Sequence, residues 1–156
     1  HASLAIVSFC LGGNGRENCG VSLEKSTIGP YLSDLMSALT SGPLSLDMTN
    51  SSQVRNGAAT VLVRAIAAVS CLANVGGEDF VPFYGSTMPG LLGCAYFGLE
   101  LDHASGCVHP VSPQALSHEL SMLRGAALES ATIVGEAIGE DNAAMYRSDA
   151  EKIMVL

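Results

Sequence analysis

Apolar and polar positions alternate along much of this chain with the period of a helix. In residues 28–40 (IGPYLSDLMSALT), apolar side chains recur at spacings of three and four: Ile28, Tyr31, Leu32, Leu35 and Leu39. Such spacing gathers the side chains on one face of an amphipathic helix. Pro30 lies near the start of this segment, where a missing backbone N–H is harmless. We therefore predict a helix over 28–40.

The longest helical pattern covers residues 54–75. Its predicted buried stripe consists of four apolar positions, Val61, Ala65, Ala68 and Leu72. Gly76 and Gly77 follow directly, and glycine at this place is typical of a helix C-terminus. The sequence therefore predicts one long helix that stops at the glycine pair.

Two prolines interrupt the next segment, residues 78–92 (EDFVPFYGSTMPGLL). Glu78 and Asp79 open it, and the helix dipole favours acids at a helix start. Pro82 then falls in the first turn, where it is tolerated. Pro89 falls inside the helix, where proline costs about 3 kcal/mol and is expected to bend the axis. The predicted buried face consists of Phe80, Phe83, Tyr84, Met88, Leu91 and Leu92.

A second long helix is predicted over residues 114–139, and a further helix follows to the end of the chain, capped by residues 140–142. The buried stripe of the long helix is predicted to contain Leu116, Leu120, Leu123, Ala127, Ala131, Val134 and Ile138. Residues 12–27, 41–53 and 98–113 are predicted to be loops from their composition. Residues 2–11 are apolar throughout, so periodicity does not distinguish a strand from a buried helix there.

The order of these elements predicts an all-α fold with an internal repeat. A shorter helix entered through a proline precedes a longer helix rich in alanine, and this order occurs twice. Pro30 and Pro82 head equivalent helices about 52 residues apart. With loop insertions allowed for, a two-helix period of roughly 40–47 residues is typical of HEAT and armadillo repeats. Such hairpins cannot bury their own apolar faces, so they stack into a solenoid.

Three segments resemble the karyopherin-β (importin-β) family of nuclear transport receptors: FVPFYGSTMPGLL from Phe80, LRGAALESATIVGEAIG from Leu123 and PYLSDLMSAL from Pro30. The resemblance implies a HEAT-repeat α–α superhelix over residues 1–156. In this interpretation 1–11 end one repeat, 28–75 and 79–139 form two repeats, and 140–156 form the first helix of the next. The chain is expected to be an internal fragment of a longer receptor, with loops 12–27 and 98–113 longer than those of the family.

The resemblance also implies a function of binding without chemistry. Members of this family carry basic cargo proteins through the nuclear pore, contact phenylalanine-glycine nucleoporins and release cargo under the control of Ran-GTP. Ran is expected to bind mainly through repeats outside this chain. The expected location is the cytoplasm and the nucleus, with shuttling between them, and no cofactor or metal is expected.

Composition and charge fit a protein-binding role. The chain has 156 residues, of which 48% are hydrophobic and 14% are charged, and its net charge is −8. This charge disfavours nucleic acid, whose phosphates it repels, and favours basic protein partners. No uninterrupted apolar run reaches the length of a membrane span, so no membrane partner is predicted. The cysteines are odd in number and several lie in apolar helical contexts, which favours reduced thiols.

Three acids on the last long helix are the candidate protein-binding residues. Glu129 and Glu136 are seven positions apart and therefore share one helix face, while Glu119 lies earlier and somewhat around the helix. In the karyopherins the second helix of each repeat lines the concave surface that holds cargo, so the resemblance implies that these acids face bound protein. The alternative is a solvated helix face with ordinary charges.

Other interpretations stay open. A HEAT scaffold of another kind, such as a phosphatase regulatory subunit, would share the helix order. A small helical enzyme using the loop Gly12–Gly15 is disfavoured because that loop lacks the third glycine of a Rossmann motif and the lysine of a Walker motif. Asp102, His103, Cys107 and His109 crowd one loop, but they lack the paired spacing of a zinc site.

Overall fold

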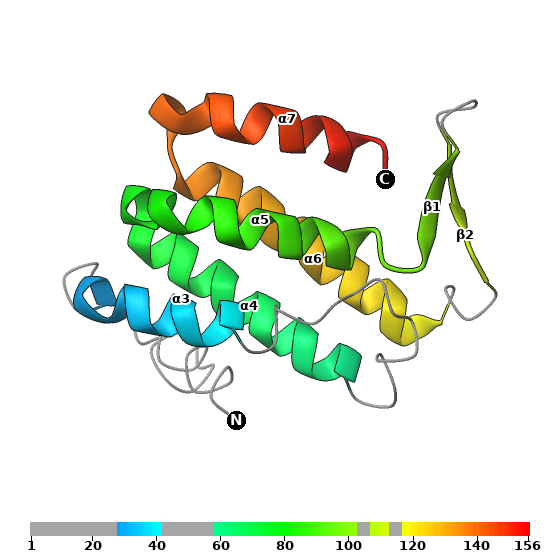
Figure 1. The fold of residues 1–156 in the computed structure, drawn as a ribbon, viewed down its shortest axis with the longest axis horizontal. Coiled ribbons are helices and arrows are strands. Elements are labelled where there is room, and N and C mark those ends of the chain that lie inside the picture. The colour runs from blue at the N-terminus through cyan, green and yellow to red at the C-terminus, as the bar shows by residue number, and fades with distance from the viewer. Residues whose placement is uncertain (1–27, 42–57, 103–106, 113–116) are drawn as a thin grey trace, which may run out of the picture.

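The computed structural model describes residues 28–41, 58–102, 107–112 and 117–156, and these residues are mostly helical (Figure 1). The α-helices are α3 (Leu32–Ser41), α4 (Ala58–Gly76), α5 (Val81–Ala95), α6 (His118–Ala137) and α7 (Ala143–Met154). Short 3-10 turns lead into three of them: η1 (Gly29–Tyr31), η3 (Gly77–Phe80) and η5 (Glu140–Asn142). The prediction of a helical fold is confirmed for these residues. The repeat end predicted at 1–11, the loop 12–27, most of the loop 41–53 and the stripe residue Leu116 lie outside the described residues.

The helices form two layers (Figure 1). Helices α3, α5 and α7 lie side by side in one layer and run in the same direction, while α4 and α6 lie behind them and run the opposite way. Helix α6 packs against both α4 and α5, and so joins the layers. Each helix is therefore antiparallel to its neighbour in sequence and parallel to the next helix but one.

The core fills the space between the layers. Its largest fully buried side chains are Ile28, Met36, Leu62, Ile66, Val69, Leu72, Phe80, Met88, Leu91, Leu123, Val134 and Ile138. The predicted apolar faces are confirmed at most positions, but two positions are wrong. Tyr31 is 62% exposed, because it ends a 3-10 turn whose tighter winding rotates it off the α-helical face. Val61 is 53% exposed, because α4 buries the neighbouring positions Leu62 and Ile66 instead.

Prolines and glycines mark the helix boundaries as predicted. Pro30 and Pro82 occupy the first turns of η1 and α5. Helix α4 ends at Gly76, and Gly77 then takes a φ of +56°, a conformation that glycine adopts without steric cost. Helix α5 continues through Pro89. The bend expected at Pro89 stays a prediction.

The segment between α5 and α6 contains a small sheet, which corrects the prediction of a loop over 98–113. Strands β1 (Leu99–Asp102) and β2 (Cys107–Pro110) pair antiparallel, with Glu100 opposite His109. They project beyond the helical layers as a separate ribbon (Figure 1). Four-residue strands are too short for their alternation to stand out from loop composition, which is why periodicity missed them.

Helix α7 has no fully buried residue, and a few side chains attach it to the rest of the protein. Tyr146 and Ile153 pack against the core, and the other contacts are polar. The Tyr84 hydroxyl donates to Asp149 Oδ2 at 2.8 Å, and the Tyr96 hydroxyl donates to the Lys152 carbonyl at 2.6 Å. Lys152 Nζ in turn pairs with Asp149 Oδ1 at 2.8 Å. Tyr84 of α5 and Tyr96, which follows the end of α5, therefore hold α7 at two points that lie one helical turn apart on α7.

One helical run is long and apolar enough to cross a membrane by length and composition alone. It covers Ala59–Ala95, which includes α4, η3 and α5, and its most apolar window has a mean hydropathy of 1.7. Half of that window is buried inside the protein.

Candidate protein-binding groove

Helix α6 positions the three candidate acids. Ser117 caps its start by accepting a hydrogen bond from the backbone N–H of Leu120 at 3.4 Å, which satisfies one of the unpaired donors of the first turn. The face of α6 that packs into the core consists of Leu123, Ala127, Ser130, Ala131 and Val134. This packing fixes the rotation of α6 about its axis.

Helices α4 and α6 lie against each other with their sequences in parallel register. The Ser130 hydroxyl donates to the Ile66 carbonyl at 3.5 Å, which marks the level at which the two helices meet. Residues near the start of α4 share a hollow with the start of α6, and residues near its end share one with the end of α6. A groove therefore runs between the two helices along their length.

The groove is made of three adjoining hollows. The first, of about 280 Å³, lies at the N-terminal ends of both helices, the middle one is about 550 Å³ and the third is about 360 Å³. Val63 and Met122 line both the first and the middle hollow, and Ser70, Cys71 and Ile133 line both the middle and the third. Because neighbouring hollows share walls, they form one continuous groove.

Each candidate acid lies at a different hollow of this groove. Glu119 lines the first, Glu129 the middle one and Glu136 the third. All three side chains are exposed. The structure thus brings the three predicted residues to one groove.

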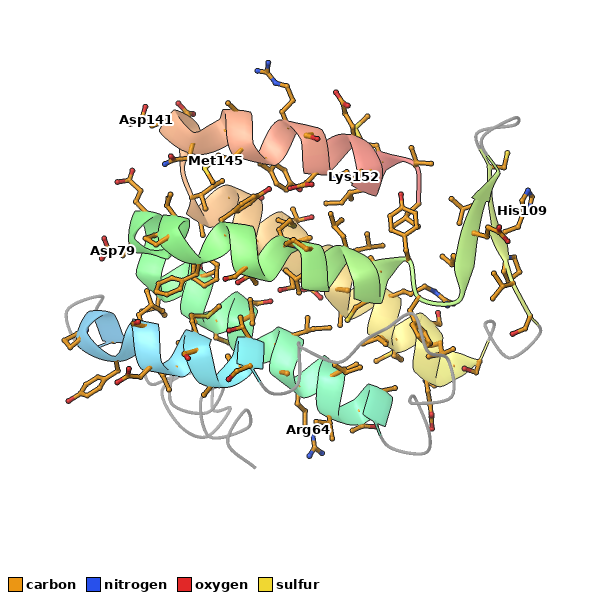
Figure 2. The ribbon with its side chains drawn as sticks, in the orientation of Figure 1. Arg64, Asp79, His109, Asp141, Met145 and Lys152 are labelled. Atoms are coloured by element: carbon orange, nitrogen blue, oxygen red, sulfur yellow. The ribbon has the colours of Figure 1, made fainter. Side chains whose placement is uncertain are left out.

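Charge is distributed unevenly along the groove. Arg64 and His118 line the first hollow together with Glu119. Arg64 extends outward from the edge of α4 (Figure 2). Among the residues that the structure describes, those that line the middle and third hollows include Glu129 and Glu136 but no lysine or arginine. The C-terminal half of the groove is therefore acidic, and the N-terminal half has nearly balanced charge.

The contribution of α4 to the groove was missed by the sequence reasoning. Val63, Ala67 and Cys71 form its wall, and Ile66 lies at its base. Their spacing of three and four is visible in the sequence, as a second stripe beside the buried one. A stripe on one helix does not show a groove, however, because the opposite wall comes from another helix about 60 residues away in sequence.

Other candidate groups do not gather into a site. Cys107 and His109 lie exposed on β2, and Asp102 lies on β1; His109 is seen on the ribbon, away from the helices (Figure 2). His103 and the loop Gly12–Gly15 lie outside the described residues. Within the described part of the chain, no three histidine, cysteine, aspartate or glutamate residues are grouped to hold a metal.

Two cysteines of the helices are reduced thiols with altered acidity. Burial raises the pKa of the Cys94 thiol to about 11, and burial also raises the pKa of Cys71. A raised pKa leaves little thiolate near neutral pH, and the thiolate is the reactive form. Cys71 is therefore part of the wall of the groove without being a strong nucleophile.

No protein-family model matches this chain, and no solved structure matches it.

Proposed function

We propose that this chain is part of a nuclear import receptor of the karyopherin-β family, which binds cargo proteins and carries them through the nuclear pore under the control of Ran-GTP. Within that family its segments resemble importin-5. The observation that carries the proposal is the acidic groove between α4 and α6, because it lies in the layer that such a receptor would turn toward its cargo.

The two-layer arrangement supports a HEAT-repeat array. In this interpretation α3 with α4 and α5 with α6 are two repeats (28–75 and 79–139), and α7 is the first helix of the next (140–156). Stacked hairpins of this kind place all first helices in one layer and all second helices in the other. Helices α3, α5 and α7 share one layer here, and α4 and α6 share the other (Figure 1).

The charge of the groove supports basic cargo. Glu129 and Glu136 are exposed on one helix face, and the whole chain has a net charge of −8. An acidic surface attracts basic proteins over a distance of about a Debye length and speeds their encounter. In the proposed receptor the layer of α3, α5 and α7 contacts phenylalanine-glycine nucleoporins. Ran-GTP acts mainly through other repeats. The receptor moves between the cytoplasm and the nucleus.

The decisive experiment is a pulldown with core histones as the basic cargo. The full receptor that contains this chain is expected to retain histones and to release them when Ran-GTP is added. Retention of histones in the presence of Ran-GTP would exclude the transport role and would favour a HEAT scaffold of another kind.

A matched pair of variants connects this function to the groove. Reversal of both charges (Glu129→Lys with Glu136→Lys) is expected to weaken histone binding by about tenfold or more, because two attractive charges become repulsive. The control is Asp141→Lys with Glu151→Lys, which reverses the same number of charges at exposed positions of η5 and α7 outside the groove and is expected to change binding little. Equal effects of both changes would show that only net charge matters.

A further inference from the structure

The groove between α4 and α6 offers two kinds of contact side by side. Among the described residues, Glu129 and Glu136 line the groove with no arginine or lysine beside them, whereas Arg64 shares the first hollow with Glu119. A basic side chain is therefore attracted to the C-terminal half of the groove more strongly than to its start.

The middle hollow is lined mainly by apolar residues and is open to solvent on one side. Its lining includes Val63, Ile66, Ala67, Met122, Ala126 and Ile133. Gly125 lowers one wall, because a Cβ placed there would meet no other atom within 4 Å. Met122 is 53% exposed, and its flexible thioether can adjust to a bound side chain. A hollow of about 550 Å³ with such walls has room for one large apolar side chain.

We infer that this groove binds an extended segment of a partner protein that presents one large apolar side chain beside two basic side chains. The inference rests on the proposed function and specifies the kind of cargo segment that the groove selects. The apolar side chain enters the middle hollow, and the basic side chains lie against Glu129 and Glu136. Apolar burial thus adds to charge attraction and makes the groove selective among basic segments.

The spacing of the acids sets the spacing of the basic groups. At 1.5 Å per helical residue, the seven positions from Glu129 to Glu136 correspond to about 10 Å. An extended chain covers that distance in about three residues. Packed helices lie about 8–10 Å apart, whereas a helix with its side chains is about 10–12 Å wide, so an extended segment reaches deeper into the groove than a helix.

The test uses two labelled peptides and the 156-residue chain. The first peptide is Leu-Gly-Ser-Lys-Gly-Ser-Lys, and the second has serine in place of the leucine. Fluorescence anisotropy measures the affinity of both at low salt. The leucine peptide is expected to bind about tenfold more tightly, as the burial of one leucine side chain predicts.

Two variants separate the apolar contact from the charged one. Gly125→Leu fills the middle hollow from the α6 side and is expected to remove the advantage of the leucine peptide while leaving the serine peptide unaffected. Gly85→Leu makes the same change at an open position of α5, outside the groove, and is expected to change neither affinity. Glu129→Gln with Glu136→Gln is expected to weaken both peptides about tenfold or more.

The outcomes distinguish this inference from the proposed function. Equal affinities for the two peptides, or no effect of Gly125→Leu, would overturn the inference and leave the acidic surface of the receptor intact. Failure of both peptides to bind would also overturn the inference. The role as a transport receptor is tested separately, by the release of histones when Ran-GTP is added. Circular dichroism of each variant shows that it is folded, and leucine in place of an exposed helical glycine favours folding.

Discussion

Gly135 lies directly under the ring of Tyr146, at the point where α6 meets α7. A Cβ at Gly135 would lie 2.6 Å from a ring carbon of Tyr146, closer than two carbon atoms can approach. Gly125 lies ten residues earlier on the same helix, and a Cβ placed there would meet no other atom within 4 Å. The two glycines thus form a matched pair in which only one is required by packing.

Substitution of each glycine by alanine is expected to change stability in opposite directions. Gly135→Ala should lower the free energy of unfolding by about 1–3 kcal/mol, since the tyrosine must move. Gly125→Ala should raise it by about 0.5–1 kcal/mol, because alanine is the better helix former. Urea denaturation followed by circular dichroism measures both. A gain in both variants would show that Tyr146 does not pack on Gly135.

Thr87 is a second residue whose side chain is expected to lower the stability of the folded protein. Its side chain is fully buried, and its hydroxyl has no hydrogen-bond partner among the described residues. A buried hydroxyl without a partner costs about 1–3 kcal/mol. Thr87→Val keeps the shape and removes the hydroxyl, so we expect a gain of about 1 kcal/mol in the free energy of unfolding.

Thr132→Val is the control for this change. Thr132 is exposed, and its hydroxyl donates to the Leu128 carbonyl at 3.1 Å, so its loss is expected to bring no gain. Equal melting temperatures of Thr87→Val and the unmodified protein would mean that the Thr87 hydroxyl is satisfied.

At the scale of the element, α7 is a helix with no fully buried residue, so its attachment to the rest of the protein depends on a few side-chain contacts. Removal of the Tyr84 hydroxyl in Tyr84→Phe leaves Asp149 with one partner fewer. One hydrogen bond to a charged carboxylate contributes about 1.5–3 kcal/mol, so the backbone amides of α7 should exchange with solvent about tenfold faster or more. The amides of α4 and α6 should keep their rates. Unchanged exchange in α7 would contradict the attachment described above.

The same contact makes the attachment of α7 dependent on pH. Burial would raise the pKa of Asp149, but hydrogen bonds from Lys152 and Tyr84 and the charge of Lys152 together hold it below its usual value. A carboxylate with a lowered pKa stabilises the folded state above its unfolded pKa of about 4, and this contribution is lost as pH falls through the folded pKa. Asp149→Asn should therefore melt lower than the unmodified protein at pH 6.

The difference in melting temperature between these two proteins should narrow as the pH falls below about 4. Thermal melts between pH 3 and pH 7 test this expectation. A constant difference across that range would mean that the charge of Asp149 does not stabilise α7.

Much of the fold at this scale was predictable from periodicity and from the positions of proline and glycine. The apolar spacing in α3, α4, α5 and α6 and the stop at Gly76 each have a local physical cause that the sequence carries. The β1–β2 ribbon was not predictable in this way, since it depends on pairing between two four-residue segments. Tyr31 was wrongly predicted to be buried, because the same kinds of residue, proline among them, occur at the start of a 3-10 turn and of an α-helix, and the sequence does not distinguish the two.

The candidate site was predictable only in part. The shared face of Glu129 and Glu136 follows from their spacing on one helix. That α4 supplies the opposite wall could not be read from either helix alone, because the parallel register of α4 and α6 is set by packing through residues such as Ile66 and Ser130.

At the scale of the whole molecule, the excess of acids predicts how partners approach. Association of a basic polymer such as polylysine is expected to slow several-fold between about 50 mM and 500 mM salt, since ions screen the attraction. Stopped-flow mixing measures this rate. Glu129→Gln should reduce the dependence on salt more than Glu119→Gln does, because Arg64 lines the same hollow as Glu119. A rate that does not change with salt would contradict this expectation.

The same-direction alignment of α4 and α6 has a geometric consequence for longer ligands. Each further hairpin stacked in this manner would create another furrow beside the first, so the surface would become corrugated across the stacking direction. A long flexible chain lying across such ridges could occupy several furrows at once, each weakly. When several weak contacts are made by one ligand chain, the overall affinity exceeds that of each contact. Such a ligand would therefore bind tightly and still dissociate quickly without a single strong pocket.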